Sequence, residues 1–232
     1  MIKNKKIFIA CDTANIKKVN KIIKNTKSKK INIGYKFGLE FFYSKYGRSF
    51  LLKMNKKIPI FLDLKLNDIP NTCISAINSL KDLKNIKYIT VHINGGFEML
   101  RAVKKATKKI NKNIKILGVT ILTSLSNKSL KKIGYTKNVG QIVIQQTKLA
   151  KLAGLDGIVC SANEVKLIKK IYKKKEIITP GIRLQGDKVN DQSRVSSPKD
   201  AFTNGATGIV IGRSITQGSI KNNLKKLIRS LN

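Results

Sequence analysis

The sequence predicts an α/β protein, a (β/α)8 TIM barrel, from two observations. Short apolar segments of strand character alternate eight times with longer segments of helical character along the 232 residues. These units average about 29 residues, which suits one strand followed by one helix. Such alternation implies a parallel sheet, and eight units suffice to close it. A doubly wound open sheet is the alternative. Because composition changes nowhere abruptly, residues 1–232 are expected to form a single domain.

The expected strands are short runs rich in isoleucine, valine, leucine and phenylalanine. They cover residues 7–12, 32–37, 59–64, 88–92, 115–120, 157–160, 176–179 and 208–211. One helix is expected after each strand, at residues 15–24, 41–54, 72–83, 97–109, 139–153, 162–172, 198–204 and 220–231. The fifth helix has the plainest pattern, because Val139, Val143 and Ile144 recur at helical spacing.

The chain carries a formal net charge of +36, which raises the question of a nucleic-acid partner. Only six of its 48 basic residues are arginine, and the lysines are spread over every expected helix. A nucleic-acid surface would more often favour arginine interleaved with aromatic residues. We therefore expect solvated helix faces and no specific nucleic acid, with weak, salt-sensitive binding to polyanions.

No segment predicts a membrane partner or a metal site. The apolar runs are too short to span a bilayer, and the run at residues 7–10 is too short for a signal peptide. A cytoplasmic location is expected by default. Cys11, Cys73 and Cys160 lack metal-ligand spacing and are expected to be reduced and mostly buried. His92, the one histidine, has no suitably spaced partners for zinc.

The segment at residues 63–72 carries the clearest chemical pattern. Asp63 and Lys65 stand two residues apart at the end of an expected strand, so their side chains point to the same face. Asp68 lies beyond the strand, ahead of the next helix. Burying such alternating charges is costly unless each is paired. A fold does not need them, so they indicate chemistry.

Polar residues and glycines also lie at or just beyond the carboxyl ends of the other expected strands, where barrel active sites lie. They are Asp12, Lys36, His92, Thr123, Arg183, Gly212 and Arg213. Gly212 and Arg213 form a glycine turn and an arginine at the end of a strand. This pattern is typical of a phosphate-binding site, but it also occurs in an ordinary surface turn. The long segment after residue 179 is either a lid or a plain connector. His92 is as consistent with a structural role as with a catalytic one.

On these residues the chain resembles the orotidine 5'-phosphate decarboxylase family, and most closely its bacterial branch. Residues 63–72 are the most specific match, and the other matching segments are residues 36–38, 91–96, 119–124, 154–161, 179–183 and 211–216. The resemblance covers nearly the whole chain. It implies a homodimeric (β/α)8 enzyme with shared active sites that converts orotidine 5'-phosphate to UMP and carbon dioxide. It also implies that no metal or organic cofactor takes part.

The resemblance also implies a role for individual residues. Lys65 would protonate C6 of the pyrimidine, within an alternating charge network of Lys36, Asp63, Lys65 and Asp68, with Asp68 entering the partner subunit's site. Asp12 and Lys36 would contact ribose, and Thr123 the pyrimidine. Phosphate would be bound by Gln192, Gly212 and Arg213, with Arg183 nearby. The rest of the segment is expected at the substrate site: Leu64, Leu66, Asn67, Ile69, Pro70, Asn71 and Thr72.

Two positions depart from the family pattern. Cys11 replaces a usually aliphatic residue and should face the helices, away from Asp12, and Asn67 replaces a frequent histidine.

The nearest rival function is a magnesium-dependent sugar-phosphate decarboxylase or aldolase of the same barrel superfamily. Those enzymes share the Asp-x-Lys-x-x-Asp spacing, but they would be expected to place a metal-binding carboxylate on the second strand. This chain has Lys36 there. Nucleic-acid binding is a different class of function, and only the net charge supports it.

Overall fold

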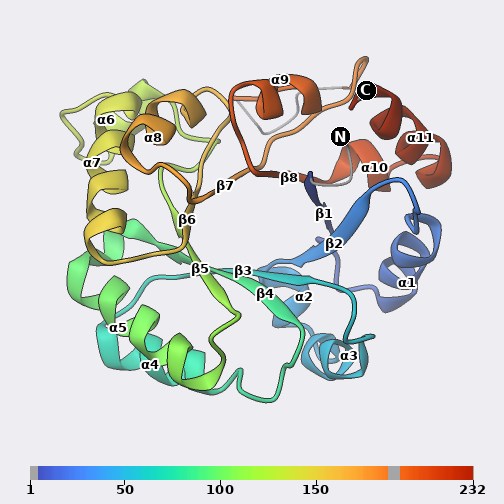
Figure 1. Cartoon of the computed structure of the whole chain (residues 1–232), viewed down its shortest axis with the longest axis horizontal. Coiled ribbons are helices and arrows are strands. Elements are labelled where there is room, and N and C mark those ends of the chain that lie inside the picture. The colour runs from blue at the N-terminus through green and yellow to red at the C-terminus, as the bar shows by residue number, and fades with distance from the viewer. Residues whose placement is uncertain (1–4, 188–193, 232) are drawn as a thin grey trace.

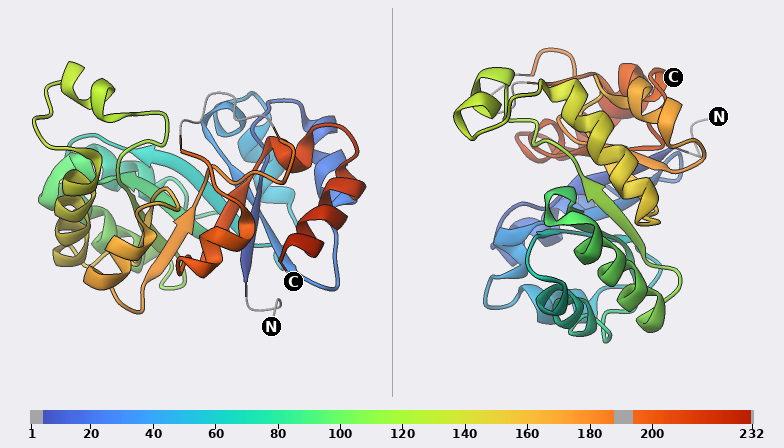
Figure 2. Two further views of the ribbon diagram at one scale, coloured as in Figure 1. Left: turned by 90° about the horizontal axis from the view of Figure 1, so that it is seen from above. Right: turned by 90° about the vertical axis from the view of Figure 1, so that its left-hand side faces the viewer.

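The computed structural model describes residues 5–187 and 194–231, and these form a closed barrel. Its eight strands are parallel and pair in chain order, and β8 pairs with β1 to close the sheet (Figure 1). The predicted barrel is therefore confirmed, and the open-sheet alternative is wrong. Helices surround the sheet on the outside, and α6 lies at the periphery near α7 and α8 and projects on the carboxyl-end side of the barrel (Figure 2).

The strands lie close to their predicted positions. They are β1 (Lys6–Ala10), β2 (Asn32–Phe37), β3 (Ile60–Leu66), β4 (Ile86–His92), β5 (Lys115–Val119), β6 (Gly157–Val159), β7 (Glu176–Thr179) and β8 (Gly208–Ile211). The α-helices are α1 (Ile16–Asn25), α2 (Leu39–Phe42), α3 (Gly47–Lys53), α4 (Pro70–Asn78), α5 (Gly96–Ile110), α6 (Asn127–Lys132), α7 (Val139–Leu152), α8 (Val165–Ile171), α9 (Pro198–Thr203), α10 (Arg213–Thr216) and α11 (Ile220–Ser230). A 3-10 turn, η2 (Ile93–Gly95), follows β4.

The helix predicted at residues 41–54 is divided into α2 and α3. Between them the Ser44 hydroxyl donates a hydrogen bond to the carbonyl of Phe41, at 2.7 Å, and the chain turns. Gly47 then packs against that carbonyl so closely that a Cβ at this position would lie 1.8 Å from the oxygen. The short helices α6 and α10 were not predicted, since four to six residues are too few to show a helical period.

Alternation along the strands creates two apolar cores. Inward-facing side chains fill the barrel, where the rings of Phe8, Phe61 and Tyr88 pack edge to face with centroids 5.4 to 5.5 Å apart. Outward-facing side chains pack against the helices, and Cys11 is among them, as predicted. All three cysteines are buried and free, which confirms that expectation.

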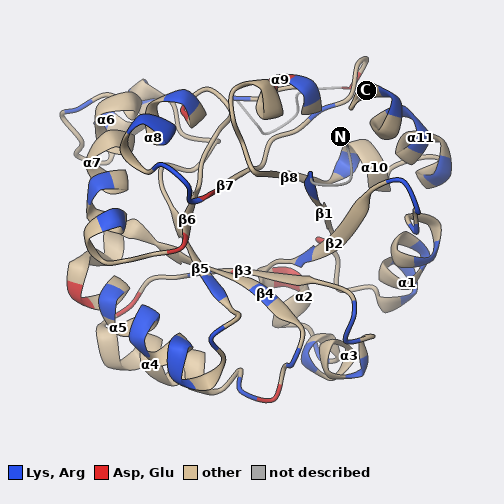
Figure 3. Cartoon of the chain, in the orientation of Figure 1, with Lys and Arg blue, Asp and Glu red and all other residues tan. Residues whose placement is uncertain are grey.

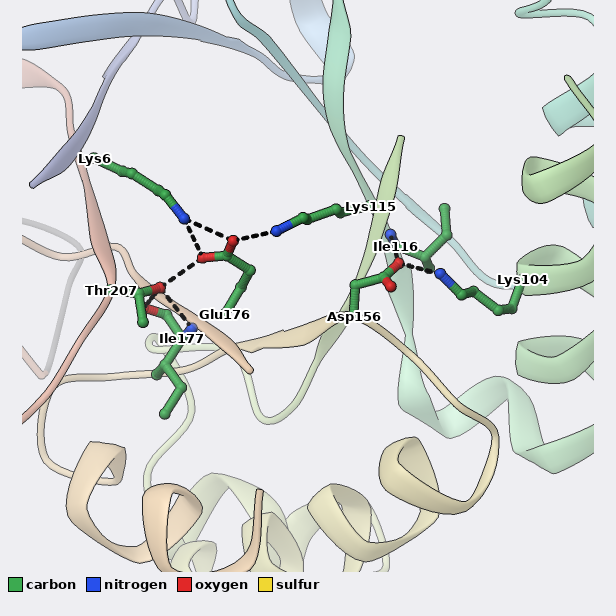
Figure 4. Close-up of polar contacts among 8 residues, drawn as sticks. All are labelled: Lys6, Lys104, Lys115, Ile116, Asp156, Glu176, Ile177 and Thr207. Atoms are coloured by element: carbon green, nitrogen blue, oxygen red, sulfur yellow. Dashed lines mark hydrogen bonds and ion pairs between the residues drawn. The ribbon is translucent and has the colours of Figure 1, made fainter. Parts of the chain in front are cut away.

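The amino-terminal end of the barrel is closed by a buried carboxylate (Figure 4). Glu176, the first residue of β7, accepts hydrogen bonds from Lys6 at 2.7 Å, from Lys115 at 2.6 Å and from Thr207 at 2.9 Å. Beside it Asp156 pairs with Lys104 and accepts the N–H of Ile116. Polar groups at this end of a barrel indicate a contribution to stability.

Lysines and arginines are spread over the outer helices all around the barrel instead of gathering on one side of it (Figure 3). Over the described residues, no helix has the length and apolar character that crossing a membrane requires.

The stability of the barrel is expected to depend on Glu176 in a pH-dependent way. Burial opposes ionisation, but Lys115 and Lys6 lower the pKa of this carboxyl to about 2, from an ordinary 4.5. A depressed pKa contributes stability above pH 4.5 that is lost as the pH falls toward 2. Glu176→Gln should therefore lower the free energy of unfolding by about 3 kcal/mol at pH 7, measured by urea denaturation.

The difference between wild type and Glu176→Gln should shrink as the pH falls from 4.5 toward 2. The matched control is Glu98→Gln, at an exposed position on α5, which should change stability by less than about 0.5 kcal/mol. Equal losses in the two variants, or a difference that does not depend on pH, would contradict this role for Glu176.

Candidate functional site

A cavity of about 960 Å³ opens at the carboxyl ends of the strands. Its floor is made by inward-facing apolar side chains, namely Ala10, Phe61, Val119, Val159 and Val210. The predicted site residues that line its walls are Asp12, Lys36, Asp63, Lys65, Thr123, Arg183, Gly212 and Arg213. Residues from six different strand ends thus meet in one place. Lys18, Lys21 and Gln217 line it as well, although nothing in their sequence context marked them.

Four of these side chains form a row of alternating charge. The Nζ of Lys36 lies 2.8 Å from a carboxylate oxygen of Asp12 and 3.3 Å from one of Asp63. The same Asp63 oxygen lies 2.8 Å from the Nζ of Lys65. Gly38 leaves space for the first pair, since a Cβ there would lie 3.1 Å from the Asp12 oxygen and 3.3 Å from Lys36 Nζ. The prediction that Asp63 and Lys65 share a face is confirmed.

The centre of this row is shielded from water. The side chains of Lys36 and Asp63 are 10% and 13% exposed, and that of Lys65 is 31% exposed. Burial raises the pKa of Asp63, but Lys36, Lys65 and a hydrogen bond from Thr90 outweigh it and hold this pKa below its ordinary value. Burial likewise lowers the pKa of Lys36, but Asp63 and Asp12 outweigh it, so that the net shift is upward. Asp63 and Lys36 are therefore charged together at neutral pH.

The backbone of Lys65 is strained. Its φ of 51° lies in the left-handed region, which residues other than glycine seldom occupy. The pairing of β3 with β4 shifts its register between Leu62 and Leu66, so Lys65 sits on an irregular part of the strand. Strain of this kind costs on the order of 1–3 kcal/mol and is concentrated at functional sites. The fold therefore holds Lys65 in this position at a cost in conformational free energy.

Thr90 on β4 supports both members of the central pair. Its hydroxyl donates to Asp63, at 3.0 Å, and accepts the backbone N–H of Lys65, at 2.9 Å. This role of Thr90 was not predicted from the sequence. A signal was present in the sequence, because Thr90 is the one threonine or serine in an apolar run and stands two residues before His92, on the same face.

His92 ends β4 beside the charge row. Burial lowers the pKa of its imidazole, and the nearby Lys65 lowers it further, so the ring is neutral at pH 7. Its Nδ1 is buried and makes no hydrogen bond to the described residues. This neutral ring adds no charge to the row.

The remaining residues of the 63–72 segment do not line the cavity of their own chain. Leu64 faces the outer core, and Leu66 packs against it. The carboxylate of Asp68 is exposed and accepts only the N–H of Ile69 among the hydrogen bonds drawn between described residues. The others that stand outside the cavity are Asn67, Ile69, Pro70, Asn71 and Thr72.

The other end of the cavity is bordered by arginine and glycine. Gly212 precedes the short helix α10, which begins with Arg213, and Arg183 follows β7 on the neighbouring loop. Gly181, with a φ of 76°, turns the chain between that strand and Arg183. Gln192, predicted to bind phosphate with them, lies outside the described residues.

No group of three or more histidine, cysteine or acidic side chains in residues 5–187 and 194–231 could hold a metal ion. Where the magnesium-dependent rival would be expected to carry a carboxylate on β2, Lys36 places an ammonium between Asp12 and Asp63.

Comparison with known proteins gives a consistent result. The sequence model of the "Orotidine 5'-phosphate decarboxylase / HUMPS family" matches residues 5–225. A curated orotidine 5'-phosphate decarboxylase of Ehrlichia chaffeensis is 46% identical over 188 residues, which are 79% of each chain. Another, of Wolbachia sp. subsp. Brugia malayi, is 42% identical over 96% of each chain. The crystal structure of orotidine 5'-phosphate decarboxylase from Lactobacillus acidophilus superposes with a TM-score of 0.83 and 31% identity, covering 98% of this chain and 99% of that one.

Thr90→Val is expected to destabilise the site measurably. The substitution keeps the shape of the side chain but leaves the N–H of Lys65 without its acceptor and removes a donor to Asp63. The loss should be about 1–3 kcal/mol in the free energy of unfolding, measured by urea denaturation. The matched control is Thr107→Val on α5, a buried threonine whose hydroxyl, among the described residues, bonds only to the carbonyl of Val103 in its own helix. A larger loss in the control than in Thr90→Val would contradict the assignment.

Proposed function

Because this chain belongs to the orotidine 5'-phosphate decarboxylase / HUMPS family, we propose that Lys65 is the acid of its reaction, the decarboxylation of orotidine 5'-phosphate to UMP and carbon dioxide. The observation that carries the proposal is the placement of Lys65 Nζ in the cavity, 2.8 Å from a buried carboxylate, on a strained backbone. An ammonium so held is oriented by its ion pair and open to a ligand, since 31% of its side chain is exposed.

The chemistry explains why an ammonium is needed. When the bond from C6 to the carboxyl carbon breaks, carbon dioxide leaves and the electron pair remains on C6. No adjacent carbonyl delocalises this carbanion well, so a fixed positive charge must stabilise it. A proton from Lys65 Nζ then bonds to C6, and the resulting amine recovers a proton from water. One residue thus both stabilises the charge and quenches it.

Asp63 and Lys36 prepare Lys65 for this role. Asp63 holds the ammonium of Lys65 in place through their ion pair, and Lys36 helps to keep Asp63 ionised. Repulsion between Asp63 and the substrate carboxylate would add to the effect, although ground-state destabilisation is a contested contribution. Asp12 and Lys36 are proposed to contact the ribose.

The far end of the cavity is proposed to hold the phosphate. Gly212 allows backbone N–H groups to approach its oxygens, and Arg213 supplies bidentate, charge-assisted hydrogen bonds. Arg183 lines the same end, and Gln192 is proposed to join them. Thr123, on the loop after β5, is proposed to contact the pyrimidine. Binding energy from the phosphate can then support chemistry at the distant C6.

We also propose that the enzyme is a cytoplasmic homodimer that shares its active sites. Asp68 does not reach Lys65 within its own chain, and next to it Ile69 is 66% exposed. After the neighbouring strand β2, Tyr43 and Tyr46 are 75% and 56% exposed. Exposed apolar groups of this size favour an interface. A second copy docked there would bring Asp68 and residues 69–72 to the partner's cavity.

Lys65→Ala should lower kcat for orotidine 5'-phosphate by at least about 10⁴-fold, because it removes both the stabilising charge and the proton. The variant should still fold and bind UMP. Ultraviolet absorbance follows the reaction, and calorimetry measures binding of UMP. The matched control is Lys105→Ala, at an exposed position on α5, which should keep the wild-type rate.

Substantial turnover by the Lys65→Ala variant would exclude Lys65 as the proton donor. Adding a chelator to the same assay of the wild-type protein tests the magnesium-dependent rival function. A magnesium-dependent enzyme should lose its activity, whereas the proposed function predicts an unchanged rate.

Sharing of the active site is tested by mixing two inactive variants. Lys65→Ala and Asp68→Ala should each be inactive alone, but a heterodimer of the two contains one intact site. After subunit exchange, random assortment should restore about a quarter of the wild-type rate per subunit, because half of the dimers are mixed. Two copies of the same variant treated identically serve as the control. A mixture that stays inactive although exchange is verified by mass would show that Asp68 acts within its own chain. An Asp68→Ala variant that is active alone would show that this residue is not required.

A further inference from the structure

A buried arginine outside the charge row connects three loops around the cavity. The Nη1 of Arg194 lies 2.6 Å from a carboxylate oxygen of Glu164, and their side chains are 13% and 8% exposed. Its Nη2 donates to the carbonyls of Ile121, at 3.3 Å, and Leu122, at 3.0 Å. Arg194 follows β7, Glu164 follows β6 and the two carbonyls follow β5. One guanidinium therefore contacts three consecutive loops at the carboxyl end of the barrel.

Each of these loops contributes to the cavity wall. The loop after β5 lines it with Ile121, Leu122, Thr123 and Ser124, so the two carbonyls that Arg194 holds directly precede Thr123. Cys160 lines it from the loop after β6, ahead of Glu164.

The backbone near Arg194 is itself fixed. Ser196, two residues on, accepts the N–H of Arg183 at 2.9 Å and donates to the carbonyl of Gly181 at 3.1 Å. The arginine thus extends from a pinned segment of chain.

The hydrogen bonding of the guanidinium shows that this geometry has a cost. Its Nε is buried and makes no hydrogen bond within the described part of the chain. A buried ion pair of this kind is weak evidence for stability, because desolvation offsets the attraction between the charges. Its clearest consequence here is to fix the positions of the two carbonyls.

We propose that Arg194 and Glu164 are positioning residues, whose ion pair holds the loop after β5 so that Thr123 faces the substrate. Glu164 orients the guanidinium, and the guanidinium holds the carbonyls of Ile121 and Leu122. Neither residue touches the reacting atoms. The inference rests on the proposed contact between Thr123 and the pyrimidine.

The test compares Arg194→Gln and Glu164→Gln with a control at the other end of the barrel. Asp156→Asn also breaks a partly buried ion pair, with Lys104, but Asp156 precedes the amino end of β6 and does not line the cavity. Both loop variants should lower kcat/KM for orotidine 5'-phosphate by 10-fold or more, at a temperature where all proteins are folded. Asp156→Asn should stay within twofold of wild type even where it lowers the melting temperature as much.

A double-mutant cycle with Thr123→Val measures the coupling between Arg194 and Thr123 in kcat/KM, which a purely structural role of Arg194 would not produce. If Arg194 acts through Thr123, Arg194→Gln should lower kcat/KM less than threefold in the Thr123→Val background. Full additivity of the two effects would overturn the proposal, as would equal losses in Arg194→Gln and Asp156→Asn.

Two further controls keep the outcome decisive. If the single variants do not fold, the double variant Arg194→Met with Glu164→Leu is tested in their place, because it leaves no unpaired buried charge. A wild-type rate in that double variant would overturn the inference. The wild-type protein separates this inference from the proposed function. If wild type does not decarboxylate orotidine 5'-phosphate, the function is rejected. If wild type is active and the loop variants are equally active, only the positioning role is rejected.

Discussion

The arrangement at the carboxyl end of the barrel depends on one buried carboxylate, that of Asp63. Without the two lysines, burial would drive this carboxylate toward its neutral form. Without the carboxylate, the ammonium groups of Lys36 and Lys65 would repel each other. Between the two ammonium groups it is ionised, and each of them is neutralised on one side. The side of Lys65 that faces the cavity remains available to a ligand. The hydroxyl of Thr90 and the strained backbone at Lys65 follow from this requirement, because both serve to hold the pair in place.

The two ends of the barrel use the same chemical unit for different purposes. At the amino-terminal end Glu176 also lies between two lysines, Lys6 and Lys115, and also has a depressed pKa. The difference is the space beside the unit. The packed rings of the inner core close the barrel above Glu176, whereas a cavity of about 960 Å³ opens beside Asp63. A carboxylate between two lysines is therefore a structural element by itself, and becomes a candidate catalytic one where a substrate can reach it.

The sequence predicted what depends on local pattern and missed what depends on tertiary contacts. The closed barrel follows from the alternation of strands and helices along the chain, and the structure confirms it. The shared face of Asp63 and Lys65 follows from the alternation of side chains along one strand, and it is confirmed as well. The register shift in β3 and the role of Thr90 depend on how β4 packs beside it, which no spacing within one strand reveals. The placement of Arg194 depends on three loops at once. The site roles of Asp68 and residues 69–72 came from the family resemblance, because one chain does not contain their proposed partners.

The composition of the chain sharpens the meaning of these contacts. Only 12 carboxylates face 48 basic side chains, so ion pairs are limited by the supply of acids and not of bases. Six of the acids form ion pairs among the described residues, and four of those six are the buried or half-buried Asp63, Asp156, Glu164 and Glu176. The lysines around the outside create a positive field that attracts any phosphate ester, but such a field does not orient one. Orientation has to come from the few positions where a carboxylate fixes a cation, and these lie at the two ends of the barrel and between its loops.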